Sequence, residues 1–346
     1  MASRSRLLLS LVLYCLLATS YTNVTGDGDY LSKDIGVCYG FNGDNLPSPN
    51  ALVTMLKRYG IGKLRIFEPN LPLQDALKGS DIDLVLGVKN QDIPTLASSL
   101  EASEQWVATN VLPYVNDIAI PYVSVGNEVV PGQFSDGIVP AMQNLQNVLL
   151  SHNLQGMRAT TVVHMDVLTN TYPPSAATFS EASMPYMTAI LQHLQDVGAP
   201  LLFNIYPYFV YASNPTDVRL DYAQFTATGP VISDGNLTYM NLFDAMVDSV
   251  FWAMEKIGVT DVDLVVSESG WPHDGNGEFT TVDLAGTYNK NYMNHVLSHV
   301  GTPKKPGAYI EGFIFSMVDE DLKPAGVEQN FGMFKPNLVP NFNIFA

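Results

Sequence analysis

The segment Leu264-Val-Val-Ser-Glu-Ser-Gly-Trp-Pro272 runs from a continuous apolar stretch into a carboxylate, Glu268, and then into residues that end a strand. A strand that is apolar along its length is typical of a parallel sheet, because it is buried on both faces. The same order of residues occurs at Tyr122-Val-Ser-Val-Gly-Asn-Glu128, where a second carboxylate follows a second run. These two segments indicate a parallel α/β fold whose strands end in acidic side chains.

Six further runs of this kind bring the number of predicted strands to eight. The eight predicted strands are Ile35–Tyr39, Lys63–Phe67, Ile82–Val88, Tyr122–Val125, Ala159–Val163, Leu201–Tyr206, Leu264–Ser267 and Gly312–Ser316. A doubly wound sheet would carry a glycine-rich phosphate turn after its first strand, and the sequence has neither G-x-G-x-x-G nor a phosphate loop. We therefore predict an α/β fold of the (β/α)8 TIM-barrel type, with a single catalytic domain over residues 35–346.

Helical patterns alternate with these strands, with apolar residues three and four positions apart. They cover Ala51–Tyr59, Thr95–Val111, Val139–Ser151, Met184–Val197, Asn241–Ile257 and Val282–Val300. The first has the clearest boundaries, because Ser48 is a capping residue, Pro49 suits the first helical position and Gly60 ends the pattern.

The first 20 residues have the three-part order of a signal peptide. Arg4 and Arg6 precede the apolar stretch 7–17, and the small residues 18–20 offer a cleavage site. An ordinary buried first helix is the alternative. We expect a secreted, extracellular protein of the apoplast or cell wall, with a lead-in at 21–34. The C-terminal residues have neither an apolar anchor nor a lipid-attachment signal, so we expect no membrane anchor.

Removal of this leader would leave Cys38 as the only cysteine, so the fold would depend on its core rather than on disulfides. Cys38 lies in an apolar run, which favours a buried, unreactive thiol. Two N-glycosylation sequons, at Asn23 and Asn236, become plausible acceptors in a secreted chain.

The composition excludes several classes of protein. The chain has 34 acidic and 17 basic side chains and a net charge of −17, yet it is 47% hydrophobic and only 15% charged. It is too apolar and too aromatic for a disordered acidic protein. Without the leader, which carries Arg4 and Arg6 and no acid, the charge becomes −19. Nucleic acids and anionic membranes need clustered positive charge, so a neutral or cationic ligand is expected.

Two glutamates, Glu128 and Glu268, each follow an apolar strand directly. The active site of such a barrel lies at the carboxyl ends of its strands, so the two side chains are expected to share one site. A pair of carboxylates is what glycoside hydrolysis needs, one protonated to assist the leaving oxygen and one ionised to attack. The alternative for a single glutamate is a solvated loop acid or a structural ion pair.

Aromatic residues gather after the sixth strand, in Phe203-Asn-Ile-Tyr-Pro-Tyr-Phe-Val-Tyr211. Pro207 ends a central strand, so Tyr208, Phe209 and Tyr211 are predicted to lie in a loop. Large rings at the mouth of a site suit the apolar faces of sugars. The inward half of this segment is expected to be core.

Other chemistries have weaker support. Gly36-Val-Cys38-Tyr-Gly40 resembles a nucleophile elbow, but Cys38 falls inside a strand rather than at a turn. His295 and His299 are four residues apart on a predicted helix, without the accompanying metalloprotease pattern, and a solvated face is the favoured interpretation. We expect no cofactor and no metal.

Several motifs together resemble the plant β-1,3-glucanases of glycoside hydrolase family 17, from about Ile35 to the end of the chain. The matching segments are IGVCYG (35–40), NLPSP (45–49), RIFEPN (65–70), SVGNEV (124–129), TYPPSAATF (171–179), FNIYPYFVY (203–211), LVVSESGWP (264–272), DEDLKP (319–324) and EQNFGMF (328–334). The resemblance implies a retaining endohydrolase on a TIM barrel.

The resemblance also implies roles for individual residues. Glu128 would be the proton donor and Glu268 the nucleophile. A supporting cluster falls on Glu320, Lys323 and Glu328, and substrate-binding positions fall on Tyr39, Asn127, Tyr206, Phe209 and Trp271. Lys323 is expected to keep Glu268 ionised, and Asn127 to donate to the sugar 2-hydroxyl.

Two residues depart from the family pattern. Asp319 stands where the family has Asn, and His273 stands where it has Ser or Thr. Both lie next to predicted site segments, so subsite contacts and the pH profile are the properties they are expected to affect.

The sequence thus predicts a secreted, monomeric endo-β-1,3-glucanase that cleaves callose or fungal wall glucan by double displacement. Two alternatives remain: an endohydrolase of mixed 1,3;1,4-linked glucan, and a non-catalytic glucan-binding protein on the same fold.

Overall fold

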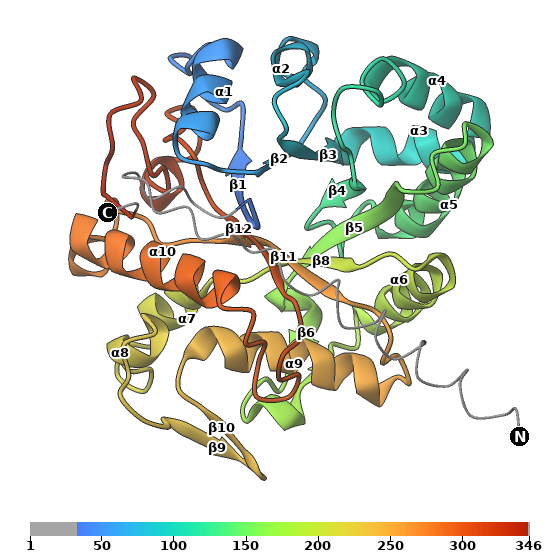
Figure 1. The fold of residues 1–346 in the computed structure, drawn as a ribbon. Helices are drawn as coiled ribbons and strands as arrows, with labels where there is room; N and C mark the ends of the chain where they lie inside the picture. Colours follow the sequence, from blue (N-terminus) through green and yellow to red (C-terminus); the bar gives the residue numbers. More distant parts are fainter. Residues whose placement is uncertain (1–32, 345–346) are drawn as a thin grey trace, which may run out of the picture.

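A computed structural model describes residues 33–344 of the chain (Figure 1). Within these residues, eight parallel strands close a barrel. They are β1 (Ile35–Tyr39), β2 (Lys63–Ile66), β3 (Asp83–Val88), β4 (Tyr122–Asn127), β5 (Arg158–His164), β8 (Leu201–Asn204), β11 (Leu264–Ser269) and β12 (Glu311–Ile314). Each predicted strand coincides with one of them, and the predicted barrel fold is confirmed. The predicted signal peptide and Asn23 lie outside the described residues.

The barrel closes between its first and last strands. Each strand pairs with its neighbour along the chain, and β12 returns to β1 with Ile35 opposite Gly312. Gly36 allows this approach, because an added Cβ would lie 2.2 Å from the Phe313 ring. All eight strands therefore deliver their carboxyl ends to one face of the barrel.

The helices lie around the barrel (Figure 1). They are α1 (Pro49–Arg58), α2 (Leu71–Leu77), α3 (Ile93–Ser98), α4 (Leu100–Asn110), α5 (Ser135–Ser151), α6 (Met184–Val197), α7 (Pro207–Ser213), α8 (Leu220–Ala223), α9 (Leu242–Lys256) and α10 (Val282–Leu297). Helix α1 begins as predicted, with the Ser48 side chain accepting from the Ala51 amide and Pro49 in its first turn.

Two helix predictions need correction. The pattern read as one helix over Thr95–Val111 is two helices, because the chain is extended at Ser99, whose side chain caps α4 by accepting from Ala102 N at 3.0 Å. The segment after Pro207 is the short helix α7 rather than a loop. Proline ends the strand as expected, but it also suits the first turn of a helix.

Long connections follow β5 and β8. The first contains the hairpin β6 (Leu168–Thr169) and β7 (Thr178–Phe179), and the second contains α7, α8 and the hairpin β9 (Ile232–Asp234) and β10 (Leu237–Tyr239). Both lie on the same side of the barrel (Figure 1). Asn236 is exposed in the turn between β9 and β10. These two connections therefore add short strands and helices to the eight strand–helix units of the barrel.

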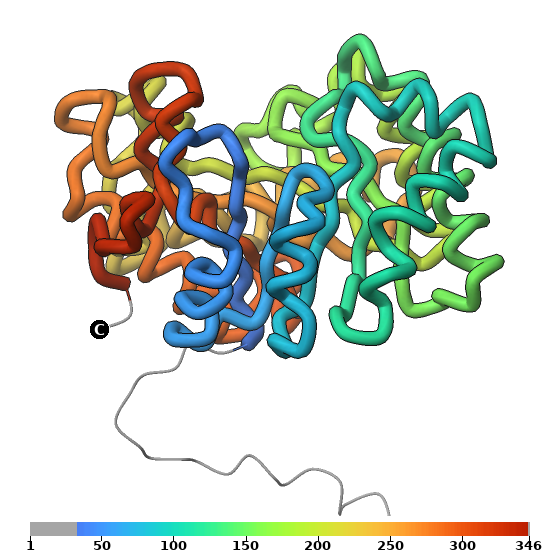
Figure 2. The backbone as a smooth tube through the Cα atoms, turned by 90° about the horizontal axis from the view of Figure 1, so that it is seen from above, coloured from blue at the N-terminus to red at the C-terminus, as the bar shows by residue number. Residues whose placement is uncertain are grey.

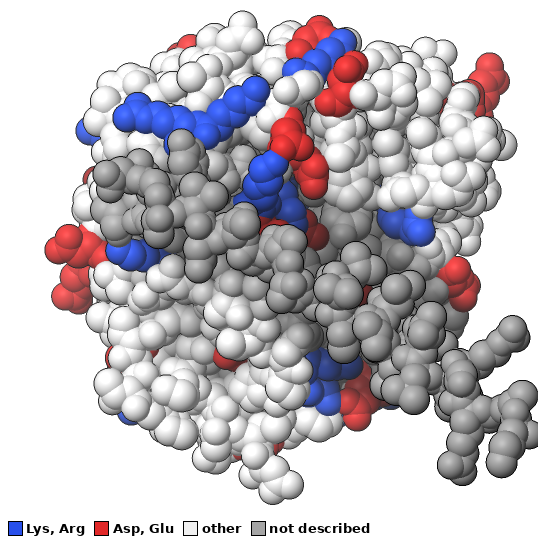
Figure 3. All heavy atoms as spheres, viewed as in Figure 1, with Lys and Arg blue, Asp and Glu red and all other residues white. Residues whose placement is uncertain are grey.

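The chain after β12 returns beside α1 (Figures 1 and 2), where Phe334 packs against Tyr59 with 5.2 Å between ring centroids. On the face shown in Figure 3, basic and acidic side chains lie next to one another. Across the described residues, none of the helices is both long and apolar enough to cross a membrane.

Candidate active site

A cleft of about 810 Å³ lies at the carboxyl ends of the barrel strands. Its lining is polar and aromatic, and all eight strand ends contribute to it: Gly40 and Phe41 after β1, Phe67 and Glu68 after β2, Lys89 and Asn90 after β3, Asn127 and Glu128 at β4, His164 at β5, Asn204 and Tyr206 at β8, Glu268 on β11, and Phe315 after β12. Phe315, Glu320, Lys323, Glu328 and Phe331 complete one wall. The two glutamates singled out in the sequence therefore open into one cavity.

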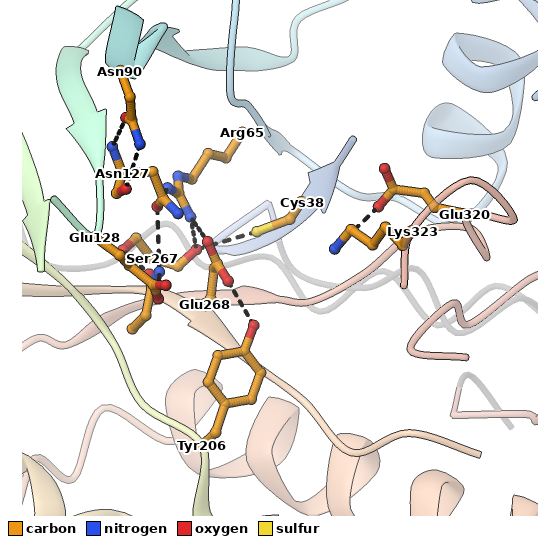
Figure 4. Close-up of polar contacts among 11 residues, drawn as sticks. Cys38, Arg65, Asn90, Asn127, Glu128, Tyr206, Ser267, Glu268, Glu320 and Lys323 are labelled. Atoms are coloured by element: carbon orange, nitrogen blue, oxygen red, sulfur yellow. Dashed lines mark hydrogen bonds and ion pairs between the residues drawn. The ribbon is translucent and has the colours of Figure 1, made fainter. Parts of the chain in front are cut away.

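Glu268 projects from β11 and is only 5% exposed. Its two carboxylate oxygens have different donors (Figure 4). Arg65 Nη1 lies 2.6 Å from Oε1, and the Tyr206 hydroxyl donates to Oε2 at 2.6 Å. A guanidinium and a phenol on one carboxylate form charge-assisted hydrogen bonds, which are the stronger kind. They hold Glu268 in a single orientation at the base of the cleft.

Arg65 is a fully buried cation on β2, and it connects several site residues. It donates to the Ser267 carbonyl at 3.0 Å and to Asn127 Oδ1 at 2.7 Å as well as to Glu268. Burial is the largest single effect and lowers the pKa of Arg65, but Glu268, together with Cys38 and Tyr206, outweighs it, so the pKa of the guanidinium is raised. The sequence reasoning missed this residue. Its position inside an apolar strand could have identified it, because a buried arginine needs a charged or polar partner.

Glu128 follows β4 with its backbone in the left-handed region, at φ 55°, and Gly126 before it has φ 72°. The pairing of β4 with β5 shifts register here, between Ser124 and Asn127. Asn204 Nδ2 donates to Glu128 Oε1 at 2.7 Å. Burial, and then the charge of Glu268, raise the pKa of Glu128. The environment of Glu128 thus favours its protonated form.

Asn127 is held by two polar neighbours that the sequence reasoning also missed. Asn90 accepts from its backbone amide at 2.8 Å and donates to its carbonyl at 3.1 Å. The Asn127 side-chain oxygen accepts from Arg65 and, at 3.3 Å, from Asn204 Nδ2. This arrangement leaves the Asn127 amide nitrogen to donate toward the cleft. Asn204 also accepts from the Ser267 hydroxyl at 2.7 Å, which links the strands of the two glutamates.

Lys323 does not contact Glu268, so that expectation is corrected: the cation beside Glu268 is Arg65. Lys323 Nζ lies 3.6 Å from Glu320 and 3.8 Å from Glu328, above the Phe315 ring. The three members of the predicted supporting cluster therefore contact one another along the cleft wall. Glu320 also accepts from the Asn42 amide at 2.9 Å.

Aromatic rings form the other part of this wall. Tyr206 and Phe209 line the cleft, as expected, and both pack against Phe331. Phe315 and Phe331, which lie in edge contact with 5.3 Å between centroids, were missed. Phe315 lies inside the predicted strand Gly312–Ser316, and an aromatic residue in such an apolar run predicts core rather than cleft. Phe209 is 44% exposed and offers an apolar surface at the mouth of the cleft.

The comparisons with known proteins agree with this geometry. The sequence model of "Glycosyl hydrolases family 17" matches residues 35–345. The chain belongs to glycosyl hydrolase family 17.

Within family 17, the chain is similar to plant enzymes. It is 48% identical over 309 residues to a probable glucan endo-1,3-beta-glucosidase of Arabidopsis thaliana. The aligned region covers 89% of this chain and 87% of that protein. It is 44% identical to a glucan endo-1,3-beta-glucosidase of Vitis vinifera, over 90% of this chain and 92% of that one. The solved structure of a beta-1,3-glucanase and allergen of Cryptomeria japonica pollen matches with a TM-score of 0.87 at 43% identity, covering 90% of this chain and 99% of that one. The chain is therefore a glycosidase of family 17.

Two predicted substrate-binding residues lie outside the cleft. Trp271 is fully buried, and its Nε1 donates to the Phe279 carbonyl at 2.8 Å, so it supports the chain after β11 from behind. Tyr39 is buried against Phe41, which does line the cleft. Burial and the nearby Glu320 raise the pKa of Tyr39 to about 12. The substrate contact of Trp271 and Tyr39 stays a prediction; in the described structure both side chains are buried next to residues of the cleft.

The remaining sequence candidates have structural partners. Cys38 is buried and donates to the Ser267 carbonyl at 3.2 Å, and burial raises the pKa of its thiol strongly. His295 lies 2.8 Å from Asp244, while His299 stacks on Tyr309. Residues 33–344 contain no group of three side chains suited to hold a metal ion.

The two departures from the family 17 pattern contact each other. His273 Nε2 lies 3.1 and 3.2 Å from the two carboxylate oxygens of Asp319. Neither side chain lines the cleft.

Proposed function

We propose that the chain is an endo-acting β-1,3-glucanase that retains the configuration of the anomeric carbon. The observation that carries the proposal is the unlike pair of carboxylates in one cleft. Glu268 is buried and accepts from a guanidinium, whereas Glu128 opens to the cleft and has a pKa that is raised by desolvation and by the charge of Glu268. A carboxyl group with a raised pKa is suited to act as the general acid, and a second carboxylate held in place by a guanidinium and a phenol is suited to act as the nucleophile. The names of the relatives support β-1,3-glucan as the substrate.

In the first step, protonated Glu128 donates to the glycosidic oxygen while Glu268 attacks the anomeric carbon. The bond to the leaving sugar breaks, and a covalent bond to Glu268 forms, which gives a glycosyl-enzyme. The Tyr206 hydroxyl and Arg65 hold the attacking carboxylate in place. Asn127 is positioned to donate to the 2-hydroxyl, a bond that strengthens as charge develops on the ring.

In the second step, Glu128, now ionised, removes a proton from water as that water attacks the anomeric carbon. The bond to Glu268 breaks, and the product leaves with the starting configuration. Retention requires the two carboxyl groups to be only about 5–5.5 Å apart, and the raised pKa of Glu128, caused in part by Glu268, is in keeping with such closeness.

The direct test is hydrolysis of linear β-1,3-glucan, followed by reducing ends and by NMR of the first-formed anomer. The wild type is expected to release the β-anomer, and Glu268→Gln to lose activity by at least about a thousandfold. A 2-deoxy-2-fluoro glucoside with a good leaving group is expected to label Glu268 covalently. Full activity in Glu268→Gln, or release of the α-anomer, would contradict the proposal.

Mixed-linkage glucan and a set of oligosaccharides define the specificity. We expect hydrolysis of 1,3-linked chains at internal bonds, so the viscosity of a long glucan should fall faster than reducing ends rise. Preferred cleavage of 1,3;1,4-linked glucan would favour the alternative substrate. Binding without turnover would favour a glucan-binding protein.

We also propose that the protein is secreted, glycosylated and monomeric. The leader-like sequence of residues 1–20 and the exposed position of Asn236 support the first two. N-terminal sequencing of protein collected from the medium, a mass shift on deglycosylation that Asn236→Gln reduces, and sedimentation analysis test the three parts separately. A chain retained in the cell would overturn the first.

A further inference from the structure

The His273–Asp319 pair lies behind the cleft wall, where two connections from different strands meet. His273 is in the chain after β11, and Asp319 is in the chain after β12. Their side chains are only 12% and 17% exposed. A hydrogen-bonded pair of ionisable side chains that is this well shielded from water is worth more than an exposed one.

Asp319 receives donors from three separate segments. Besides His273 Nε2, the Gly332 amide donates to Oδ1 at 2.9 Å and Asn341 Nδ2 donates to Oδ2 at 2.7 Å. Gly332 must be a glycine here, because an added Cβ would lie 2.1 Å from the Asp319 amide nitrogen. The Asp319 carboxylate therefore joins the chain after β11, the segment around Gly332 and the C-terminal tail.

The groups that these bonds hold are next to residues of the cleft. Asp319 precedes Glu320, and Gly332 follows Phe331; Glu320 and Phe331 both line the cavity. The His273 backbone amide makes a further bond to the Asn330 carbonyl at 2.9 Å. The wall that carries Glu320 and Phe331 is thus attached to the barrel through His273 by one backbone bond and one side-chain pair.

We propose that His273 and Asp319 are positioning residues that set the affinity of the cleft wall for glucan. Glu128 and Glu268 are held by Arg65, Tyr206 and Asn204, which the pair does not contact. Phe331 of the wall does pack against Tyr206, but the bonds from Arg65 to Glu268 and from Asn204 to Glu128 do not involve the wall. Loosening the wall is therefore expected to affect the binding of sugar rings more than the reacting carboxylates. The expected effect on KM rests on the proposed glucanase activity. The expected effect on the structure of the wall rests only on the contacts described above.

Replacement of His273 separates these effects. His273→Leu removes a charge-assisted hydrogen bond, and KM for linear β-1,3-glucan is expected to rise about tenfold, with kcat changed by less than about twofold. His273→Gln keeps an N–H donor at a similar reach and is expected to restore KM. A general loss of stability would lower the active fraction, and hence kcat, rather than raise KM.

The matched control is His152→Leu. His152 pairs with Glu104 at 2.6 Å between α5 and α4, away from the cleft. This variant is expected to leave both KM and kcat unchanged. Asp319→Ala provides the second arm: the effects of His273→Leu and Asp319→Ala on KM should be less than additive, because both remove the bond between the two side chains.

A readout without substrate makes the inference independent of the proposed function. Hydrogen exchange at the amides of residues 330–334 is expected to accelerate in His273→Leu and to stay at the wild-type rate in His152→Leu. If the wild type does not hydrolyse glucan, the proposed function fails, and exchange alone decides the inference. Unchanged exchange in His273→Leu, or unchanged KM in an active enzyme, would overturn it.

Discussion

Arg65 has the most consequences of any single residue in the site. It is buried, its charge is compensated by Glu268, and it also fixes the amide orientation of Asn127. A buried ion pair is costly to break, because removing one partner leaves the other charge without compensation. The two members are therefore expected to affect stability together rather than separately.

Arg65→Met leaves the Glu268 carboxylate buried and unpaired, and it is expected to lower the free energy of unfolding by about 3–5 kcal/mol. Adding Glu268→Gln should recover part of this loss, since a neutral amide needs no cation. Urea denaturation of the two variants measures the difference. Arg58→Met, an exposed arginine on α1, is the control with almost no effect. Equal stability of the single and double variants would contradict the prediction.

The pH dependence of the reaction should follow Glu128. The general acid must be protonated, so kcat/KM is expected to fall as pH rises through its raised pKa. The Asn204 hydrogen bond opposes that rise, because it stabilises the ionised carboxylate. Asn204→Ala should therefore move the basic limb of the pH profile to higher pH, whatever its effect on the absolute rate.

Asn144→Ala serves as the control for this experiment, because Asn144 caps carbonyls of α3 away from the cleft. Its profile should match the wild type. A basic limb that moves to lower pH in Asn204→Ala would show that Asn204 does not stabilise the ionised form of Glu128.

Among the elements, the strands and the helix ends differ in how well sequence predicts them. Eight apolar runs predict eight buried strands, because a strand that is buried on both faces consists almost entirely of apolar residues. The break between α3 and α4 depends on Ser99 as a local cap, and the apolar spacing continues through it. The sequence predicts a loop after Pro207 where the structure has helix α7, because proline suits both the end of a strand and the first turn of a helix.

The site was predictable where a residue follows a strand, as Glu128 and Glu268 do. It was not predictable where the deciding contact crosses the barrel. Arg65 and Glu268 are 203 positions apart, and only the closed barrel brings them together. For the same reason Trp271, which sits in the same motif as Glu268, could not be assigned to the core rather than the cleft without its neighbours.

Helix α9 carries a buried carboxylate that couples it to the chain between α10 and β12. Asp248 is fully buried and accepts from the Thr302 hydroxyl and from the Lys304 amide, the latter at 2.8 Å. Burial raises the pKa of Asp248 to about 6, although these hydrogen bonds oppose the shift. The folded chain therefore binds this proton more tightly than the unfolded chain does.

Stability should accordingly depend on pH through α9. The contribution of protonated Asp248 is fully present below about pH 4 and is lost as pH rises to about 6, by an amount on the order of 2–3 kcal/mol. Asp248→Asn should remove this dependence. The measurement is the free energy of unfolding at pH 4, 5, 6 and 7 for both proteins. A difference between them that stays constant over this range would contradict the prediction.

At the scale of the whole molecule, the barrel has an ion pair with a buried carboxylate at each end. The cleft end has Arg65 and Glu268. The opposite end has Lys63 and Glu311, 2.8 Å apart, at the first positions of β2 and β12, with the Tyr122 hydroxyl 3.3 Å from Glu311. The two groups are separated by the length of the strands, so one should affect stability without affecting the reaction.

Lys63→Met tests this separation. It leaves Glu311 buried without its cation and is expected to reduce the free energy of unfolding by about 3–5 kcal/mol. Because Lys63 is at the end remote from the cleft, KM and kcat of the folded enzyme should stay at wild-type values. Denaturation and steady-state kinetics on the same preparation provide both quantities. A changed KM would mean that the two ends are coupled.

The pairing of β1 with β12 also bears on how the protein is made. During synthesis the first strand leaves the ribosome long before its partner, and until then it presents an unpaired edge. The ring cannot close before β12 has been translated, and the wall that carries Glu320 and Phe331 follows later still. A nascent or prematurely terminated chain would therefore lack a complete cleft, so hydrolytic activity should arise only after synthesis has reached the C-terminal segment.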